Sequence, residues 1–155
     1  MSTADSTTLR IERTIDAPAE DVFDAWTSSE VLRRWWTVDP AGTTPVADVD
    51  LRVGGEYRLT MRDSGGDTHT VRGEYRRIDR PGLLVYTWAW EQADGEPGHE
   101  STVTVRFHGQ GERTLVEIEH TGLESVGSRD QHGIGWNGTL DSLQRRVFQR
   151  PPGAA

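Results

Sequence analysis

Apolar residues recur at every second position in several short segments of this chain, and no other sequence feature constrains the fold as strongly. The clearest segment runs from Leu84 to Trp90, where Tyr86, Trp88 and Trp90 share one face. The same period recurs in residues 9–16, 57–62, 70–78, 103–107 and 116–120. This period is typical of β-strands that bury one face. Short turn-forming stretches such as Pro81-Gly82 separate the segments, so we expect neighbouring strands to pair antiparallel.

Two short helices are predicted after the first strand. Pro18 suits the first turn of a helix over Ala19–Thr27, because its fixed backbone angle matches the helix and its missing N–H is not needed there. Ser28 or Ser29 can supply the side-chain cap of a second helix. The apolar positions at helical spacing are Val22, Phe23 and Trp26 in the first helix, and Val31, Leu32, Trp35 and Trp36 in the second.

A long helix is predicted near the C-terminus, at about residues 133–149. Its apolar stripe consists of Trp136, Leu140, Leu143 and Val147. Pro40, Gly42 and Pro45 are expected to break the chain before a run of about six consecutive strands. The single apolar face of such a sheet needs a cover, and the long helix is the element available.

We therefore expect one α+β domain over residues 8–150, with residues 1–7 and 151–155 as flexible tails. In this domain a curved antiparallel sheet of about seven strands wraps around the C-terminal helix and leaves an apolar cavity between them. The length of 155 residues is that of a single domain.

The composition excludes several classes of function. There is no cysteine, so disulfides, thiolate metal sites and cysteine nucleophiles are excluded. The 17 basic residues are all arginine and stand against 25 acidic ones, and the formal net charge of −8 disfavours a nucleic-acid partner. The sequence shows neither a signal peptide nor an apolar stretch as long as a membrane span, so we expect a cytoplasmic protein without membrane insertion.

Four segments, taken in order along the chain, resemble a known superfamily. They are Ala17–Trp26, Asp50–Tyr57, Pro81–Trp88 and Gly135–Leu143. Together they are similar to the START-related (SRPBCC) superfamily, and within it to the branch named for the activator of heat shock protein 90 ATPase. The resemblance implies the helix-grip fold. It leaves the function open, because similar domains bind lipids, polyketides or hormones, cyclise polyketides, or act as co-chaperones.

We expect the domain to bind a hydrophobic or aromatic small molecule in the cavity between the C-terminal helix and the sheet. One alternative is an enzyme of the polyketide cyclase or aromatase type that works without a cofactor. The other is a co-chaperone that stimulates a heat shock protein 90 type ATPase through its outer surface. The eukaryotic co-chaperone of this branch has an additional N-terminal domain that binds the chaperone, and the expectation that 155 residues leave no room for one disfavours this role. A homodimer is left open.

Aromatic and apolar residues on the inward faces are the candidate ligand contacts. They are Trp35, Trp36, Tyr57, Leu59, Tyr75, Tyr86, Trp88, Phe107, His120, Trp136 and Leu140. Buried indole N–H and phenol O–H groups need partners, and clusters of them commonly border a cavity that holds water or an apolar ligand with a polar tip. For each residue the alternative is an ordinary position in the core. Arg77 either anchors a ligand carboxylate or lies on the solvent face.

His120 is the candidate for proton chemistry. Strand alternation turns it inward with Val116 and Ile118. One interpretation is a general base, or a hydrogen-bond donor to a ligand carbonyl or phenol. The other is a buried imidazole whose partner is Thr121 or Trp136.

Residues 133–138 match the pattern G-x-G-x-x-G, but we expect no nucleotide site. Such a site needs a parallel strand after the helix and an acidic residue about twenty positions further on, and the chain ends first. The glycines are instead expected to let the helix begin close to the sheet. The five histidines lack the spacing of metal ligands, so we expect neither a metal nor a cofactor.

Overall fold

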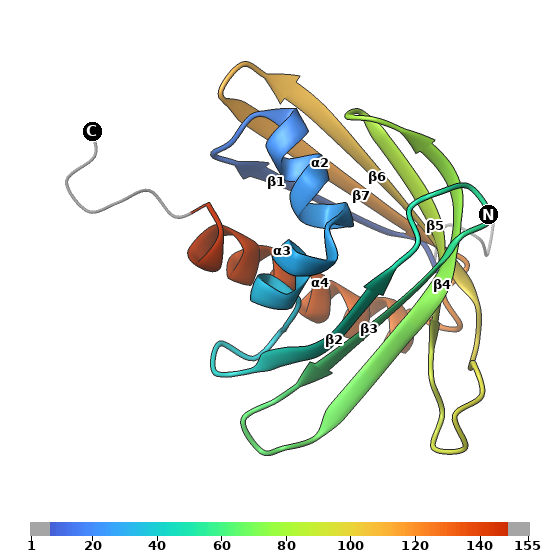
Figure 1. Ribbon diagram of the computed structural model, residues 1–155. Helices are drawn as coiled ribbons and strands as arrows, with labels where there is room; N and C mark the ends of the chain where they lie inside the picture. The colour runs from blue at the N-terminus through green and yellow to red at the C-terminus, as the bar shows by residue number, and fades with distance from the viewer. Residues whose placement is uncertain (1–6, 149–155) are drawn as a thin grey trace.

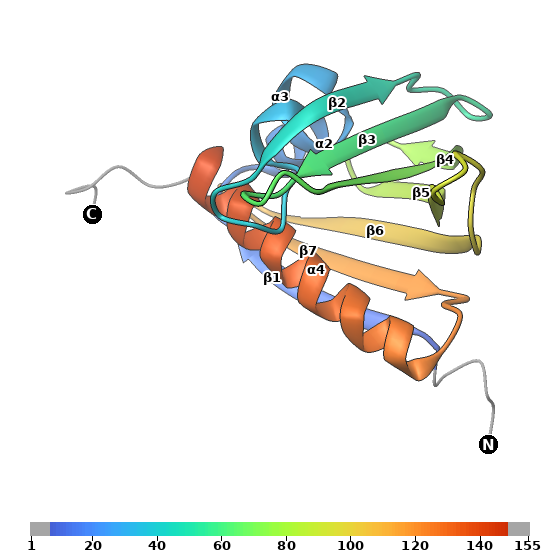
Figure 2. The same cartoon turned by 90° about the horizontal axis from the view of Figure 1, so that it is seen from below.

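A seven-stranded antiparallel sheet bends around the C-terminal helix, and all three helices lie on its concave side (Figures 1 and 2). The computed structural model describes residues 7–148. Its strands are β1 (Leu9–Ile15), β2 (Thr43–Val49), β3 (Glu56–Arg62), β4 (Thr68–Asp79), β5 (Leu83–Trp90), β6 (Ser101–Gln110) and β7 (Arg113–Thr121). Its helices are α2 (Ala19–Thr27), α3 (Ser29–Trp35) and α4 (Val126–Arg146). The predicted α+β architecture, with two short helices after the first strand, is confirmed.

The strands lie in the order β1-β7-β6-β5-β4-β3-β2. Each strand from β2 to β6 pairs with the next one along the chain, as short connections require. Strand β1 pairs instead with β7, with Ile11 opposite Ile118, because α2 and α3 carry the chain from one edge of the sheet to the other. The predicted tails, apart from Thr7, lie outside the described residues, so the domain limits stay a prediction.

Strand β2 corrects the expectation that Pro45 breaks the chain before the strands. Pro45 lies within β2, and the register against β3 shifts between Thr43 and Val46. Proline cannot donate to a strand ladder, so it is confined to edge strands and irregular positions. Strand β2 meets both conditions. It is an edge strand of the sheet, and its pairing with β3 is irregular at the proline.

Helix α4 begins seven residues before the predicted start at residue 133. Ser125 caps it, and its hydroxyl accepts a hydrogen bond from the backbone N–H of Ser128 at 3.0 Å. The glycines of residues 133–138 therefore lie inside the helix, which corrects the expectation that they open it. One of them permits a close approach, since a Cβ at Gly138 would lie 2.7 Å from Val38 Cγ1.

Aromatic rings from three elements fill most of the concave side. The ring centroid of Trp26, from α2, lies 6.2 Å from that of Trp136, from α4, in a stacked pair. Trp136 in turn lies 5.1 Å from Trp88 of β5. All three side chains are buried. Such contacts join the helices and the sheet in one core and reduce the space between them.

Candidate functional site

The space between α4 and the sheet consists of a nearly filled interior and an open groove. The interior space, which we call the inner hollow, has a volume of about 10 Å³, which is room for one water molecule. It is lined by Trp26, Leu32, Trp36, Tyr57, Leu59, Tyr75, Leu84, Tyr86 and Trp88. Helix and sheet therefore meet closely over most of the area where the sequence predicts a cavity.

The larger space, which we call the groove, has a volume of about 140 Å³. It is lined by Trp36, Val38, Met61, Trp88, Trp90, Gln131, His132, Gly135, Trp136 and Thr139. A wider depression of about 440 Å³, the mouth, is lined by Thr37, Val38, Asp39, Met61, Asp63, His69 and Trp90. The two spaces adjoin at Val38, Met61 and Trp90. An apolar cavity of about 150 Å³ accommodates benzene, so the groove has the size of one aromatic ring.

The predicted ligand contacts fall into three groups. Trp36, Tyr57, Leu59, Tyr75, Tyr86 and Trp88 line the inner hollow. Trp36, Trp88 and Trp136 line the groove. Trp35, Phe107, His120 and Leu140 are buried in the core and line neither space. The role of each residue as a ligand contact stays a prediction.

Two polar groups of the groove, Trp90 and His132, are absent from the predicted set. Trp90 continues the inward face of Trp88 in β5, so strand alternation was a usable signal. His132 lies four residues before Trp136, on the same face of α4. A helix predicted to begin at residue 133 leaves His132 outside it, so the sequence does not predict that His132 and Trp136 share a face.

Two indoles of β5 donate hydrogen bonds to one ring nitrogen of His132. Its Nε2 accepts hydrogen bonds from Trp90 Nε1 at 3.0 Å and from Trp88 Nε1 at 3.3 Å. An indole N–H only donates, so Nε2 carries no proton. The proton is on Nδ1, which lies 2.7 Å from the backbone oxygen of Ser128 and donates to it. This ring therefore orients both indoles at the wall of the groove.

His120 is buried, and the predicted partner Trp136 is one of its two hydrogen-bond partners. Trp136 Nε1 donates to His120 Nδ1 at 3.1 Å, so the proton is on Nε2, which donates to Ser101 Oγ at 2.7 Å. Burial, and to a smaller degree the nearby His132, lower the pKa of His120 to about 3. The ring is neutral at physiological pH, and both of its nitrogens are engaged.

Three tyrosines from adjacent strands line the inner hollow. The ring centroids of Tyr57, Tyr75 and Tyr86 lie 5.2 to 6.1 Å apart. The Tyr57 hydroxyl donates to the backbone oxygen of Thr87 at 2.6 Å, and the Tyr86 hydroxyl accepts from Trp26 Nε1 at 3.2 Å. Burial raises the pKa of all three phenols, so they keep their protons at physiological pH.

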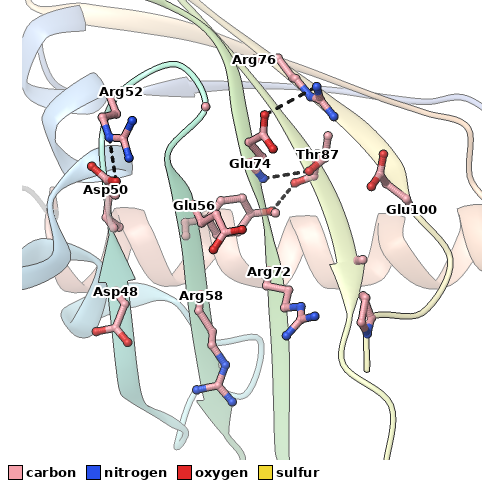
Figure 3. Close-up of a pocket in the computed structure, with 16 residues that line it drawn as sticks. Asp48, Asp50, Arg52, Glu56, Arg58, Arg72, Glu74, Arg76, Thr87 and Glu100 are labelled. Atoms are coloured by element: carbon pink, nitrogen blue, oxygen red, sulfur yellow. Dashed lines mark hydrogen bonds and ion pairs between the residues drawn. The ribbon is translucent and has the colours of Figure 1, made fainter. Parts of the chain in front are cut away.

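The convex face of the sheet carries a polar depression of about 730 Å³, which we call the outer basin (Figure 3). Figure 3 shows side chains of both charges spread over these strands, with α4 behind them. The ion pairs include Arg52–Asp50 at 2.9 Å, Arg58–Glu91 at 2.6 Å, Arg72–Glu91 at 3.7 Å and Arg76–Glu74 at 3.6 Å. Because these charges neutralise one another, the basin does not attract ligands of one sign. Arg77 pairs with Asp79 and is 65% exposed, so it lies on the solvent face.

Two further findings concern the described part of the chain. None of its helices has both the length and the hydrophobicity that crossing a bilayer requires. Within residues 7–148, His, Asp and Glu side chains nowhere gather in a group of three or more that could hold a metal ion.

The family model described as "Activator of Hsp90 ATPase homolog 1-like protein" matches residues 16–147. This range spans every element from α2 to α4 and all residues of the groove. The chain belongs to this AHSA1-like family. The family is part of the SRPBCC, or START-like, superfamily, so the resemblance seen in the sequence is confirmed. No curated protein matches the chain.

Solved structures of AHSA1-like proteins share the fold. The crystal structure of the AHSA1 protein from Silicibacter pomeroyi is 25% identical, with a TM-score of 0.80 over 89% of this chain and 95% of that one. The solution structure of the AHSA1-like protein from Aeromonas hydrophila is 27% identical, with a TM-score of 0.75 over 91% and 92%. An HSP90 activator from Plasmodium falciparum is 23% identical, with a TM-score of 0.69 over 94% and 98%, and this likeness shows the fold alone.

Proposed function

We propose that this AHSA1-like domain binds a small molecule with one aromatic ring, or an apolar group of similar size, in the groove. The observation that carries the proposal is a space of about 140 Å³ among indole rings, open to the mouth at one end. The groove is open to solvent and its walls are mainly apolar, so water gains little there and an apolar ligand that displaces it would bury this surface.

The chemistry of the lining supports an aromatic or apolar occupant. The N–H groups of Trp88 and Trp90 both point to His132, so these indoles offer apolar ring surface to the groove. Their centroids lie 5.4 Å apart in an edge-to-face arrangement, a geometry that a third ring can extend. A ligand of about ten non-hydrogen atoms gains roughly 4–8 kcal/mol, so we expect dissociation constants from about millimolar to micromolar.

Indole N–H resonances in a ¹H–¹⁵N spectrum test the proposal directly. Ethylbenzene, added to the full chain, should shift the indole signals of Trp88, Trp90 and Trp136 in a saturable manner. Trp35 is the internal control, because its N–H is bonded to the backbone oxygen of Ala25 at 3.0 Å away from the groove. Shifts that never saturate, or no shifts at all, contradict the proposal.

A helix substitution that fills the groove provides the matched variant. Gly135 lines the groove, and a Cβ there would lie 3.9 Å from Val38 Cγ2, in ordinary contact. Gly135→Leu should keep the fold, since leucine favours helices, and should weaken ethylbenzene binding by about tenfold or more. The control is Gly127→Leu on an exposed position of α4, which should bind as the unchanged chain does. Equal binding by both variants would place the ligand elsewhere.

The cyclase alternative receives no support from His120. Its two ring nitrogens are bonded to Trp136 and Ser101, and its pKa is lowered to about 3. Taking a proton from a substrate would require breaking one of these bonds and burying a charge. An active His120→Ala variant in a cyclase assay would exclude the residue as a base.

The co-chaperone alternative, which the family's name suggests, needs no groove. It is tested by adding the chain to an Hsp90-type ATPase and measuring the hydrolysis rate. Stimulation that persists in Gly135→Leu would assign the effect to the outer surface and would separate it from ligand binding.

A further inference from the structure

We infer that the ligand of the groove carries a neutral acceptor oxygen, such as the carbonyl of an aromatic ketone or aldehyde, that is bound by the indole N–H of Trp36 and the hydroxyl of Tyr75. The inference rests on the proposed function, because the carbonyl is the polar end of the same molecule whose ring occupies the groove. It names the class of ligand that the inner hollow selects.

The first step is an unpaired donor at Trp36. The other five indole N–H groups each donate to an acceptor. Trp26 donates to the Tyr86 hydroxyl, Trp35 to the Ala25 backbone oxygen, Trp88 and Trp90 to His132, and Trp136 to His120. Trp36 Nε1 alone among these indoles has no partner within residues 7–148, although the side chain is only 2% exposed. A buried donor without an acceptor costs free energy, so such groups are rare and call for a ligand or a water molecule.

The second step is a surplus of donors around the same space. No hydrogen bond joins the Tyr75 hydroxyl to another described residue, and unlike Trp36 Nε1 this hydroxyl is not one of the fully buried unpaired atoms, so a water molecule or a ligand atom can reach it. The Tyr86 hydroxyl accepts from Trp26, which leaves its proton available. Burial raises the pKa of both phenols, so they act as donors. The inner hollow is thus bordered by several protons that lack acceptors.

The third step is the position of the hollow relative to the groove. Trp36 and Trp88 line both spaces, and their ring centroids lie 5.9 Å apart. These two indoles therefore form the wall between the groove and the inner hollow, and the carbonyl oxygen of a ligand in the groove enters the hollow past the edge of the Trp36 ring. The hollow's volume of about 10 Å³ suits a single oxygen atom and excludes a second ring.

The fourth step is the choice among acceptor groups. A carbonyl oxygen has two lone pairs and brings no donor, so it matches two protons such as those of Trp36 and Tyr75. A hydroxyl or an amine would add another donor. A carboxylate would be buried without a counter-charge, because no arginine is among the described residues that line the groove or the inner hollow.

Acetophenone and α-methylstyrene are the probes for the test, since they have the same shape and differ in one C=O against one C=CH₂. Acetophenone should move the Trp36 indole proton downfield as its hydrogen bond forms, whereas α-methylstyrene should leave it near its free position. The Trp36 signal is assigned by its absence in Trp36→Phe. Trp35, which already has an acceptor, should not respond to the carbonyl.

Affinities of variants give an independent measure. In the unchanged chain the ratio of the α-methylstyrene to the acetophenone dissociation constant includes a fixed difference in hydration of the two probes. Tyr75→Phe removes one donor and should lower this ratio about tenfold, through a weaker ketone complex. Thr114→Val is the control, because it removes a buried hydroxyl that donates to the backbone oxygen of Ala17 at 2.8 Å and lines neither the groove nor the inner hollow, so it should leave the ratio unchanged.

The outcomes are distinguishable. If both probes bind in the groove but Trp36 does not shift and the ratio is the same in Tyr75→Phe, the inference is overturned and the hollow holds water, while the proposed function stands. If neither probe produces saturable shifts at Trp88, Trp90 or Trp136, the proposed function and the inference fall together.

Discussion

At the scale of single residues, indole N–H groups determine which nitrogen carries the proton in His120 of β7 and in His132 of α4. Trp136 donates to one nitrogen of His120, and Trp88 and Trp90 donate to one nitrogen of His132. A nitrogen that accepts a hydrogen bond carries no proton, so these bonds place the proton on Nε2 of His120 and on Nδ1 of His132. For His120 protonation is costly, because the charged ring would be buried and would have to give up the hydrogen bond from Trp136.

His120 should therefore make the protein less stable in acid. Its pKa is lowered to about 3 in the folded chain, against about 6.5 for an ordinary imidazole. The unfolded chain takes up the proton first, so the contribution of His120 is complete above about pH 6.5 and is lost as the pH falls toward 3. In this window the free energy of unfolding should fall by up to about 1.4 kcal/mol per pH unit on account of this residue.

Urea unfolding between pH 7 and pH 4 measures the effect. His120→Gln should be less stable at pH 7, and its stability should decline with acid more gently than that of the unchanged chain, by about 1 kcal/mol per pH unit. His69→Gln removes an exposed imidazole and serves as the control. Parallel curves for the unchanged chain and His120→Gln would show that His120 is not the titrating group.

At the scale of elements, one glycine and one cap place α4 over the sheet. Ser125 starts the helix, and its first two turns bring His132 to the groove. Gly138 then lets the helix pass close to Val38, which borders both the groove and the mouth. The width of the groove thus depends on how closely α4 approaches residue 38.

Alanine at Gly138 should destabilise the protein although alanine favours helices. The new Cβ would lie 2.7 Å from Val38 Cγ1 and 3.2 Å from the Val38 backbone oxygen, so the loop or the helix must shift. Overpacking of this kind costs about 1–3 kcal/mol, which exceeds the gain in helix propensity of about 1 kcal/mol. Gly133→Ala is the matched control, because its Cβ would lie 3.5 Å from Leu9 Cδ1, in ordinary contact. Chemical denaturation should give Gly133→Ala a larger free energy of unfolding than Gly138→Ala. The reverse order would contradict the close approach of α4 to Val38.

At the scale of the whole molecule, the sequence predicts the architecture better than the site. Alternation such as that of Tyr86, Trp88 and Trp90 is visible in a single sequence, so strand faces and the order of elements can be predicted from it. The polar start of α4 has no apolar stripe and Pro45 resembles a break, so the sequence pattern puts the start of α4 too late in the chain and does not locate β2. The size of a cavity depends on how rings interlock, as Trp88 and Trp136 do at 5.1 Å, and no periodicity encodes that distance.

The net charge of the whole molecule should make the groove prefer neutral ligands to anions. The formal net charge is −8, and Asp39 and Asp63 stand at the mouth. Backbone hydrogen bonds from Ser64 and Ala41 hold the pKa of Asp39 below its usual range, so it is ionised at neutral pH. A negative ligand has to approach against this field and lose its hydration in a groove without arginine.

Benzoate, the anionic counterpart of acetophenone, should accordingly bind at least about tenfold more weakly when the same indole resonances are followed. Raising sodium chloride from 50 to 500 mM shortens the Debye length from roughly 14 to roughly 4 Å, so the part of the difference that arises from the mouth and the net charge should shrink. The part that arises from desolvation should persist at high salt, because a carboxylate loses its hydration wherever it contacts the indole rings of the groove. Benzoate binding as tight as that of acetophenone at both salt concentrations would mean that an arginine, not the indoles, receives the ligand.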